Sequence, residues 1–264
     1  FDHWPDVSSR VSEAPGLLVM LDFDGTLAPI VSHPDLATLP PETRARLVEL
    51  RAAPSVSPAI ISGRSVADLR QRVAVENITY VGNHGRELQR PGTSEPATAL
   101  PIQKRMDEAA GYLGRQLSEV PGVVIENKGL TVALHYRQVP EAMRPRVRSC
   151  TQEIAQQMAG LIEVSEGKCV YDIFPSDGAS KGKSALALLE EYGGLPTMLP
   201  IYCGDDTTDE TVFRALPTGS ITVYVGNVGA ASAARYRLAD PGEVASLLTR
   251  IALLRRNPAQ PPRS

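Results

Sequence analysis

An unbroken apolar run, Leu17–Leu21, passes directly into two acidic residues, Asp22 and Asp24. Continuous apolar character over a short segment is typical of a parallel strand that is covered on both faces. In open α/β sheets, ligands bind outside the carboxyl ends of such strands. The run therefore predicts an α/β protein and places the protein's chemistry at the end of its first strand.

Strand and helix patterns alternate between residues 41 and 82, and the same alternation returns from Ser180 to Leu254. This order predicts an α/β fold with a Rossmann-like, doubly wound parallel sheet. The stretch 90–101 (RPGTSEPATALP) has the composition of a linker. Strand patterns and helix patterns also occur together in the sequence that follows this linker. We therefore expect a catalytic core made of residues 1–98 and 178–264, with an inserted α+β cap domain over 99–177.

The composition of the chain limits the kinds of molecule that it is expected to bind. The formal net charge is −3 and no basic stripe is present, which disfavours nucleic acid. No apolar stretch approaches the roughly 20 residues of a membrane span, and the N-terminal segment lacks a secretory signal. Cys150, Cys169 and Cys203 form no CxxC motif, which is typical of a reducing compartment. We expect a cytoplasmic monomer that acts on a small molecule and binds neither nucleic acid nor membrane.

The first strand is followed by the motif Asp22-Phe-Asp24-Gly25-Thr26. A spacing of two turns both carboxylates to the same side of an extended chain. Gly25 permits a sharp turn, and Thr26 can offer its hydroxyl or its amide to an anion. Two neighbouring carboxylates need a cation, and ligands that are all oxygen favour Mg²⁺. The competing interpretation is a plain strand end followed by an Asx turn.

Two further segments carry groups that suit a phosphate. Ser62 lies where a predicted strand runs into a helix, and Ser65 with Asp68 predicts a capped start of that helix. Ordinary turn chemistry produces the same sequence. Lys181 lies at the entry to a later helix, where a cation opposes the macrodipole. A bound phosphate would explain it, whereas Lys183 fits an exposed position better.

A second acidic cluster, Asp205, Asp206 and Asp209, follows another predicted strand. Carboxylates in close proximity repel one another unless a metal ion or a cation offsets their charge. Capping of the next helix by Asp206 or Thr207 would account for one of these acids. It does not account for all three.

These four segments, in this order, resemble the haloacid dehalogenase superfamily of phosphotransferases. The resemblance implies that Asp22 is the nucleophile that forms an aspartyl-phosphate, and that Asp24 is the general acid and base. It also implies a Mg²⁺ ion held by Asp22, by the backbone carbonyl of Asp24, and by Asp205. The phosphoryl group would be bound by Ser62, Lys181, Gly25 and Thr26, with Asp206 and Asp209 orienting metal-bound waters or Lys181.

The predicted insertion resembles the large cap of sugar phosphatases in that superfamily, and several segments of core and insertion are similar to the trehalose-6-phosphate phosphatase family. The similarity rests on the segments Gly82–Gly85, Glu126–Lys128, Leu134–Arg137 and Gly167–Asp172, and on the form GDDTTDE. It implies hydrolysis of trehalose 6-phosphate to trehalose and phosphate. The substrate contacts that it implies are Glu126, Lys128, Arg137, Asp172, His84 and Arg64.

One segment departs from that family's pattern. Asp172-Ile-Phe174-Pro175 stands where the family usually has Glu-x-Arg/Lys-Pro, and one extra residue precedes Lys181. Asp172 is shorter than Glu, and Phe174 carries no charge. Two alternatives stay open: another sugar or polyol phosphatase of the same superfamily, and a non-catalytic module that binds a sugar phosphate. A site divided between core and cap also predicts a hinged closure about residues 97–101 and 174–180.

Overall fold

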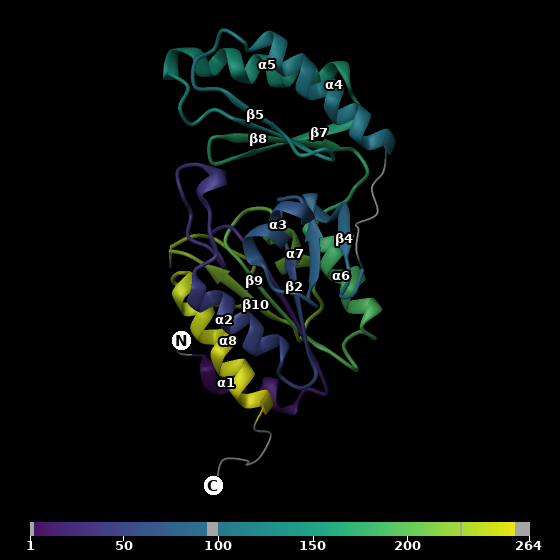
Figure 1. Cartoon of the computed structure of the whole chain (residues 1–264), viewed down its shortest axis with the longest axis vertical. Coiled ribbons are helices and arrows are strands. Elements are labelled where there is room, and N and C mark those ends of the chain that lie inside the picture. Colours follow the sequence, from purple (N-terminus) through teal and green to yellow (C-terminus); the bar gives the residue numbers. More distant parts are fainter. Residues whose placement is uncertain (1–2, 94–99, 228, 257–264) are drawn as a thin grey trace. The chain divides into compact units, whose positions relative to one another are not determined.

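The computed structural model describes residues 3–93, 100–227 and 229–256 (Figure 1). The chain divides into two compact units. The core unit comprises Phe1–Pro96 and Ser180–Ser264, and the inserted unit comprises Ala97–Ala179. No helix in the described part of the chain is both long enough and apolar enough to span a membrane.

The core unit is built on a seven-stranded sheet with the order β11-β10-β9-β1-β2-β3-β4. All neighbouring strands are parallel except β3 and β4, which are antiparallel. The predicted doubly wound parallel α/β fold is thereby confirmed. The strands are β1 (Leu17–Leu21), β2 (Val56–Ile61), β3 (Thr79–Gly82), β4 (Glu87–Gln89), β9 (Leu199–Gly204), β10 (Ile221–Val225) and β11 (Tyr236–Leu238).

Helices cover both faces of this sheet, which explains why β1 is apolar throughout. Leu17, Val19 and Leu21 pack into a core with residues of α1, α2, α3 and α8. Leu18 and Met20 point to the other face, into a core with residues of α6 and α7. The helices are α1 (Trp4–Glu13), α2 (Pro41–Arg51), α3 (Val66–Val73), α6 (Lys181–Glu191), α7 (Glu210–Ala215) and α8 (Pro241–Arg256), with short 3₁₀ helices at η1 (Pro34–Leu36) and η2 (Asn83–Gly85).

Two of these helices begin with a serine cap. Ser65 Oγ accepts a hydrogen bond from the amide of Asp68, and Ser180 Oγ accepts one from the amide of Lys183, both at 3.2 Å. The capped start predicted at Ser65 is therefore confirmed. The first cap fixes the N-terminus of α3 just after Ser62, and the second fixes the N-terminus of α6, whose first residue is Lys181.

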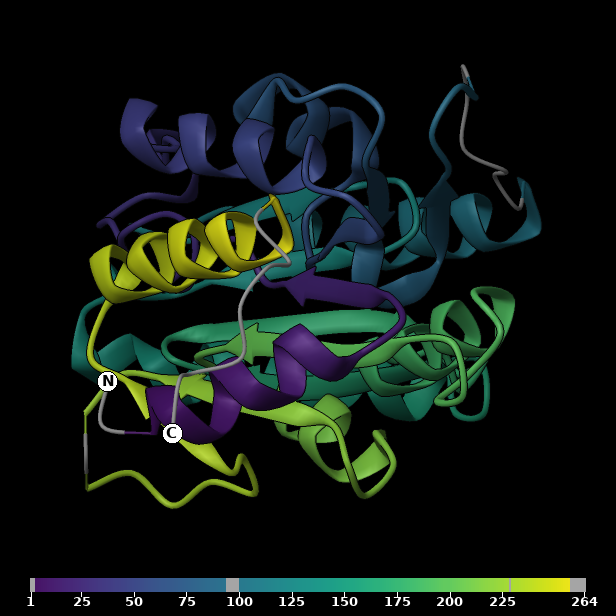
Figure 2. The same cartoon turned by 90° about the horizontal axis from the view of Figure 1, so that it is seen from below.

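Three elements of the core unit were not predicted from the sequence. Helix α1 buries Val7 and Val11, one turn apart, and packs beside α8 (Figure 2). Strands β4 and β11 are only three residues long, and they extend the sheet at its two edges. Such short segments carry too few residues to display an alternating pattern.

The inserted unit is a four-stranded antiparallel sheet with the order β5-β6-β8-β7 and two long helices on one face (Figure 1). Val132, Leu134, Tyr171 and Ile173 point from the sheet into the core beneath these helices. Its elements are α4 (Leu100–Gln116), β5 (Val124–Asn127), β6 (Val132–His135), η3 (Glu141–Met143), α5 (Arg144–Gln157), β7 (Ile162–Gly167) and β8 (Val170–Pro175).

Candidate active site

The site lies at the carboxyl end of the central strand of the core unit. β1 pairs in parallel with β2 on one side and with β9 on the other. The strand order reverses at this point, because later strands are added on the β9 side and earlier ones on the β2 side. Asp22, Ser62 and Asp205 each follow one of these three strands directly. The fold therefore brings three separate sequence motifs to one edge of the sheet.

A buried lysine joins two of the predicted acids. Lys181 Nζ lies 2.9 Å from Asp22 Oδ1 and 2.8 Å from Asp209 Oδ1. The three side chains are between 0 and 5 % exposed. Although burial lowers the pKa of Lys181, the two carboxylates outweigh it and raise that pKa above its ordinary value. The alternative of an exposed lysine is excluded for Lys181, which is buried between two carboxylates that favour its charged form.

Asp209 holds the loop that carries the other acids. Its Oδ1 accepts hydrogen bonds from Lys181 Nζ (2.8 Å) and from the Tyr202 hydroxyl (2.6 Å). Its Oδ2 accepts the amides of Asp205 (2.9 Å) and Asp206 (3.0 Å). Four donors occupy the two oxygens of one fully buried carboxylate. Asp209 therefore positions Lys181 and fixes the conformation of the loop after β9 that carries Asp205 and Asp206.

The cluster has an excess of negative charge that a metal ion would offset. Ligand oxygens of Asp22, Asp205 and Asp209 all lie within 4.8 Å of one another. Burial raises the pKa of Asp22 well above its ordinary value, neighbouring carboxylates raise it further, and Lys181 opposes the shift. Three carboxylates facing one ammonium favour an additional cation. Because both oxygens of Asp209 accept hydrogen bonds, Asp22 and Asp205 are the carboxylates best suited to hold it.

The turn after Asp22 fits tightly against this cluster. Gly25 has a φ of +79°, and a Cβ at this position would collide with the carboxylate of Asp205. Only glycine therefore satisfies both the backbone and the space. The neighbouring Thr26 hydroxyl is completely buried and has no hydrogen-bond partner among the residues that the structure describes. A buried polar atom of this kind indicates a place for a ligand or a water molecule.

Asp24 is held by Arg64 in a two-bond fork. Arg64 Nε lies 2.6 Å from Asp24 Oδ2, and Arg64 Nη2 lies 2.6 Å from Asp24 Oδ1. The same guanidinium donates to Asp68 at 2.8 Å and lies over the ring of Phe23. Asp68 also accepts from Arg72. Arg64, implied above as a substrate contact, thus orients the carboxylate of Asp24 in this structure.

The other predicted site residues of the core unit are Ser62, His84 and Asp206, and each makes a different contact. Ser62 is 2 % exposed, and its hydroxyl accepts the amide of Arg64 at 3.3 Å. The ring of His84 lies against Gly63, so His84 adjoins the loop that carries Ser62. Asp206 Oδ1 accepts the amide of Thr207 at 2.7 Å, a local turn interaction. This contact does not cap α7, whose N-cap residue is Asp209, so capping of that helix by Asp206 or Thr207 is not what the structure shows.

The predicted substrate residues of the inserted unit are divided between its sheet and a hairpin end. Glu126 pairs with Ala133, which pairs with Asp172, so both carboxylates occupy one row on the sheet face opposite the helices. Glu126 also lies 3.8 Å from Lys128 Nζ. Arg137 is placed differently and donates to the carbonyl of Lys168 at 3.4 Å.

Tyr202 is the site residue that the sequence analysis missed. Its hydroxyl donates to Asp209, and its side chain is completely buried in β9. Within an apolar strand, a tyrosine is ordinarily interpreted as core. The available signal was its position three residues before Asp205, the first acid of the cluster, since a buried hydroxyl needs a partner.

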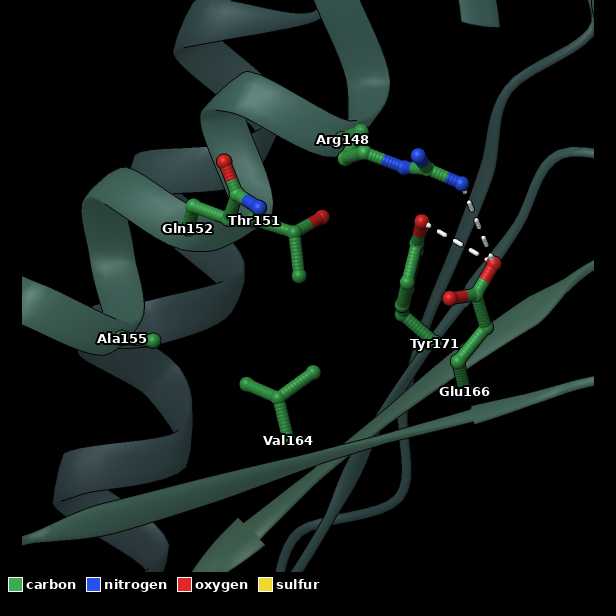
Figure 3. A pocket seen from close by; sticks show the side chains of 7 residues that line it. All are labelled: Arg148, Thr151, Gln152, Ala155, Val164, Glu166 and Tyr171. Atoms are coloured by element: carbon green, nitrogen blue, oxygen red, sulfur yellow. Dashed lines mark hydrogen bonds and ion pairs between the residues drawn. The ribbon is translucent and has the colours of Figure 1, made fainter. Parts of the chain in front are cut away.

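The inserted unit also has a pocket of its own, with a volume of about 330 Å³, between α5 and the sheet (Figure 3). Glu166 lies at its rim and accepts hydrogen bonds from the hydroxyls of Tyr136 and Tyr171. Arg148 approaches the same carboxylate at 3.9 Å. None of the predicted site residues is among those lining the pocket, which are Arg148, Thr151, Gln152, Ala155, Val164, Glu166 and Tyr171.

Comparison with known proteins agrees with this geometry. The doubly wound sheet, with an Asp-x-Asp turn, a buried lysine and a second acidic loop at its switch point, is the arrangement that the resemblance found in the sequence implies. The family model described as trehalose-phosphatase matches residues 20–242, and the chain belongs to this family. The resemblance identified from the sequence is confirmed.

Individual relatives support the same assignment. The chain is 36 % identical to the trehalose-phosphate phosphatase of Mycobacterium tuberculosis over 263 residues, which covers 94 % of this chain and 66 % of that protein. It therefore spans slightly less than two thirds of that relative's length. The C-terminal domain of C. albicans trehalose-6-phosphate phosphatase has a TM-score of 0.79 at 26 % identity and covers 94 % of this chain and 96 % of that one.

A more distant structure shares the fold alone. The C-terminal domain of the Candida albicans trehalose synthase regulatory protein has a TM-score of 0.71 at 14 % identity, over 94 % of this chain and 97 % of that one. Fold likeness at this level does not distinguish an enzyme from a regulatory protein. The chemistry of the site must make that distinction.

The contacts of Asp209 predict a large stability effect. Asp209→Asn leaves one acceptor and one amino group facing four donors. We expect it to lower the free energy of unfolding of the core unit by about 3–5 kcal/mol, the range for breaking a buried charge pair. Urea unfolding followed by circular dichroism measures this change. The matched Asp206→Asn is expected to cost about 0.5 kcal/mol or less, because Asp206 is only partly buried. Equal losses in both variants would contradict the role given to Asp209.

Proposed function

We propose that this chain is a Mg²⁺-dependent phosphatase that hydrolyses trehalose 6-phosphate to trehalose and phosphate through an aspartyl-phosphate. The observation that carries the proposal is the buried Lys181–Asp22 contact of 2.9 Å beside Asp205, at the switch point of the sheet. An ammonium held against a carboxylate nucleophile is suited to receive the negative charge of a phosphoryl group. The substrate follows from the family and from the names of the relatives.

Asp22 is the proposed nucleophile. Its carboxylate oxygen attacks phosphorus, and the bond from phosphorus to the sugar oxygen breaks. Asp24 gives a proton to the departing oxygen and then takes one from the water that hydrolyses the aspartyl-phosphate. The fork from Arg64 suits the second step, because it binds the ionised form of Asp24. In the first step Asp24 carries its proton, so its hold on Arg64 must loosen when substrate binds.

Lys181, Ser62, Gly25 and Thr26 are the proposed phosphate-binding groups. The Thr26 hydroxyl, which has no hydrogen-bond partner in the described part of the chain, and the tight turn at Gly25 support this assignment. Phosphoryl transfer depends mainly on positioning and charge stabilisation, which fixed donors provide without rearrangement. Asp209 acts indirectly by holding Lys181, and Asp206 is proposed to orient metal-bound water.

The proposed metal ion is Mg²⁺. Its ligands would be the carboxylates of Asp22 and Asp205 and the backbone carbonyl of Asp24. All are hard oxygen donors of the kind that Mg²⁺ prefers. When bound, the ion would reduce the charge repulsion between the incoming phosphate and the acidic cluster.

The inserted unit is proposed to act as the cap, over 99–177, that selects the sugar. The row that contains Glu126 and Asp172 offers acceptors to sugar hydroxyls, and Lys128 lies beside Glu126. Arg137, His84 and Arg64 are proposed as further contacts. Closure about residues 97–101, of which 97–99 lie outside the described residues, and about residues 174–180 would exclude water during transfer. The shorter Asp172 would reach less far than the Glu usual in the family.

We further propose that the protein is a cytoplasmic monomer that binds neither nucleic acid nor membrane. Its net charge of −3 supports the absence of nucleic-acid binding. Cys150, Cys169 and Cys203 are free thiols in the structure, as expected in a reducing compartment.

A phosphate-release panel tests the reaction and the substrate. With Mg²⁺, we expect kcat/KM for trehalose 6-phosphate to exceed that for glucose 6-phosphate and sucrose 6-phosphate by about 100-fold or more, because a site built for one set of hydroxyls rejects others. Without Mg²⁺ turnover should cease. Comparable rates on all three sugars would leave a phosphatase of another sugar or polyol.

The variant Asp22→Asn separates catalysis from binding in the same assay. We expect it to lose about 10⁴-fold or more in kcat, the order of loss for a covalent nucleophile. Retained turnover would refute the assignment of Asp22. A wild-type chain that binds the sugar phosphate without turnover would instead indicate the non-catalytic module.

The cap assignment is tested by Glu126→Gln. We expect KM for trehalose 6-phosphate to rise by about tenfold, the loss of one charge-assisted hydrogen bond. The kinetics of p-nitrophenyl phosphate should stay unchanged, because that substrate lacks the sugar. Glu163→Gln, on the other edge of the same unit, serves as the matched control. An equal effect of Glu126→Gln on both substrates would contradict a role in sugar recognition.

A further inference from the structure

The turn between β3 and β4 holds three successive residues in a left-handed conformation. The φ angles of Asn83, His84 and Gly85 are +47°, +56° and +102°. Residues other than glycine disfavour this region, and runs of them persist only where the surroundings fix them. Asn83 is also completely buried. The contacts that the turn makes with its neighbours therefore explain why this conformation is maintained.

On one side, the turn is bonded to the loop that carries Ser62. The amide of Asn83 donates to the carbonyl of Arg64 at 2.8 Å, and the amide of His84 donates to the carbonyl of Ser62 at 3.1 Å. The ring of His84 lies so close to Gly63 that a Cβ there would be 2.7 Å from Cε1 and Nε2. Both residues that flank Gly63 are thus fixed by backbone hydrogen bonds from the turn.

On the other side, the turn lies against the first turn of helix α6. A Cβ on Gly85 would collide with the Ser184 hydroxyl and lie 3.1 Å from the carbonyl of Ser180. Ser180 caps the helix, and Lys181 is its first residue. The hydroxyl of Ser184 donates back to the carbonyl of Ser180 at 3.1 Å. Gly85 therefore packs directly on the helical turn that presents Lys181.

We propose that the turn Asn83–Gly85 is a positioning element that fixes Ser62 and Lys181 relative to each other, so that both groups bind the same tetrahedral oxyanion. Gly85 is the positioning residue, because its lack of a side chain lets the turn approach α6. The inference rests on the proposed function, which assigns Ser62 and Lys181 to the phosphoryl group. Ser62 follows β2 and Lys181 begins α6, so the two residues belong to segments that are far apart in the sequence. The turn Asn83–Gly85 contacts both segments.

The variant Gly85→Ala tests the proposal with inorganic phosphate as the probe. In the full chain with Mg²⁺, isothermal titration calorimetry should give a dissociation constant about tenfold larger than that of the wild type, as for one weakened charge-assisted hydrogen bond. The affinity for Mg²⁺ itself should be unchanged, because the carboxylates proposed to hold it follow β1 and β9, whereas the turn is bonded to the loop after β2. The matched control is Gly92→Ala. Gly92 has a φ of +78°, and its Cβ would meet nothing within 4 Å among the described residues.

A rescue variant distinguishes positioning from general destabilisation. Adding Ser184→Ala to Gly85→Ala removes the hydroxyl that the new Cβ meets but leaves the strain of a left-handed alanine, so we expect phosphate affinity to return part of the way to that of the wild type. If Gly85→Ala does not fold, Ser184→Leu places a larger side chain against Gly85 from helix α6 and should weaken phosphate binding to a similar extent. The thermal midpoint of each variant confirms that it is folded.

Two results would overturn the inference. One is a folded Gly85→Ala variant with the phosphate affinity of the wild type. The other is a loss that Gly92→Ala reproduces or that Ser184→Ala does not rescue. A wild-type chain that neither binds phosphate nor hydrolyses trehalose 6-phosphate would contradict the proposed function instead, so the two failures are distinguishable.

Discussion

The contact between Lys181 and the carboxylates of Asp22 and Asp209 is the interaction on which the rest of the site depends. A buried ammonium requires charged partners, and each of these carboxylates requires the ammonium. Asp209 also fixes the loop after β9, because its other oxygen accepts hydrogen bonds from the amides of Asp205 and Asp206. One buried cation thus fixes the helix α6, the end of β1 and the loop after β9. A further divalent cation would complete the charge balance of this group.

The sheet explains why these groups meet. β1 lies between β2 and β9, so three chain segments leave the sheet at the same edge. A second network extends from that edge, from Asp24 through Arg64 and Asp68 to Arg72. Burial raises the pKa of Asp68, but hydrogen bonds from Arg72 and Arg64 outweigh this effect and lower it. Asp68 therefore contributes stability at neutral pH, and this contribution is lost as the pH falls through its folded-state pKa.

Much of this architecture could be predicted from the sequence because it follows from short patterns. The apolar run before Asp22 indicates a doubly covered strand, and the acids that end separate strands indicate a shared edge. The pairing of Arg64 with Asp24 could not be predicted, because the two residues are 40 positions apart and meet only when the loop after β2 folds toward the end of β1. Tyr202 and helix α1 were missed for a related reason: their partners, Asp209 and α8, are set by tertiary packing. The left-handed conformations of Asn83 and His84 were equally inaccessible, since neither residue is glycine and the conformation depends on the carbonyls of Ser62 and Arg64.

The fold is shared with proteins of different roles, so the account depends on the acidic cluster acting as a metal site. Thermal unfolding with and without Mg²⁺ is the most direct measurement of this claim. A ligand present at about 100 times its dissociation constant stabilises a protein by about 2.7 kcal/mol. We expect Mg²⁺ to raise the unfolding midpoint of the wild type and to leave that of Asp205→Asn unchanged. No rise in the wild type, or the same rise in both proteins, would contradict a metal ion bound between Asp22 and Asp205.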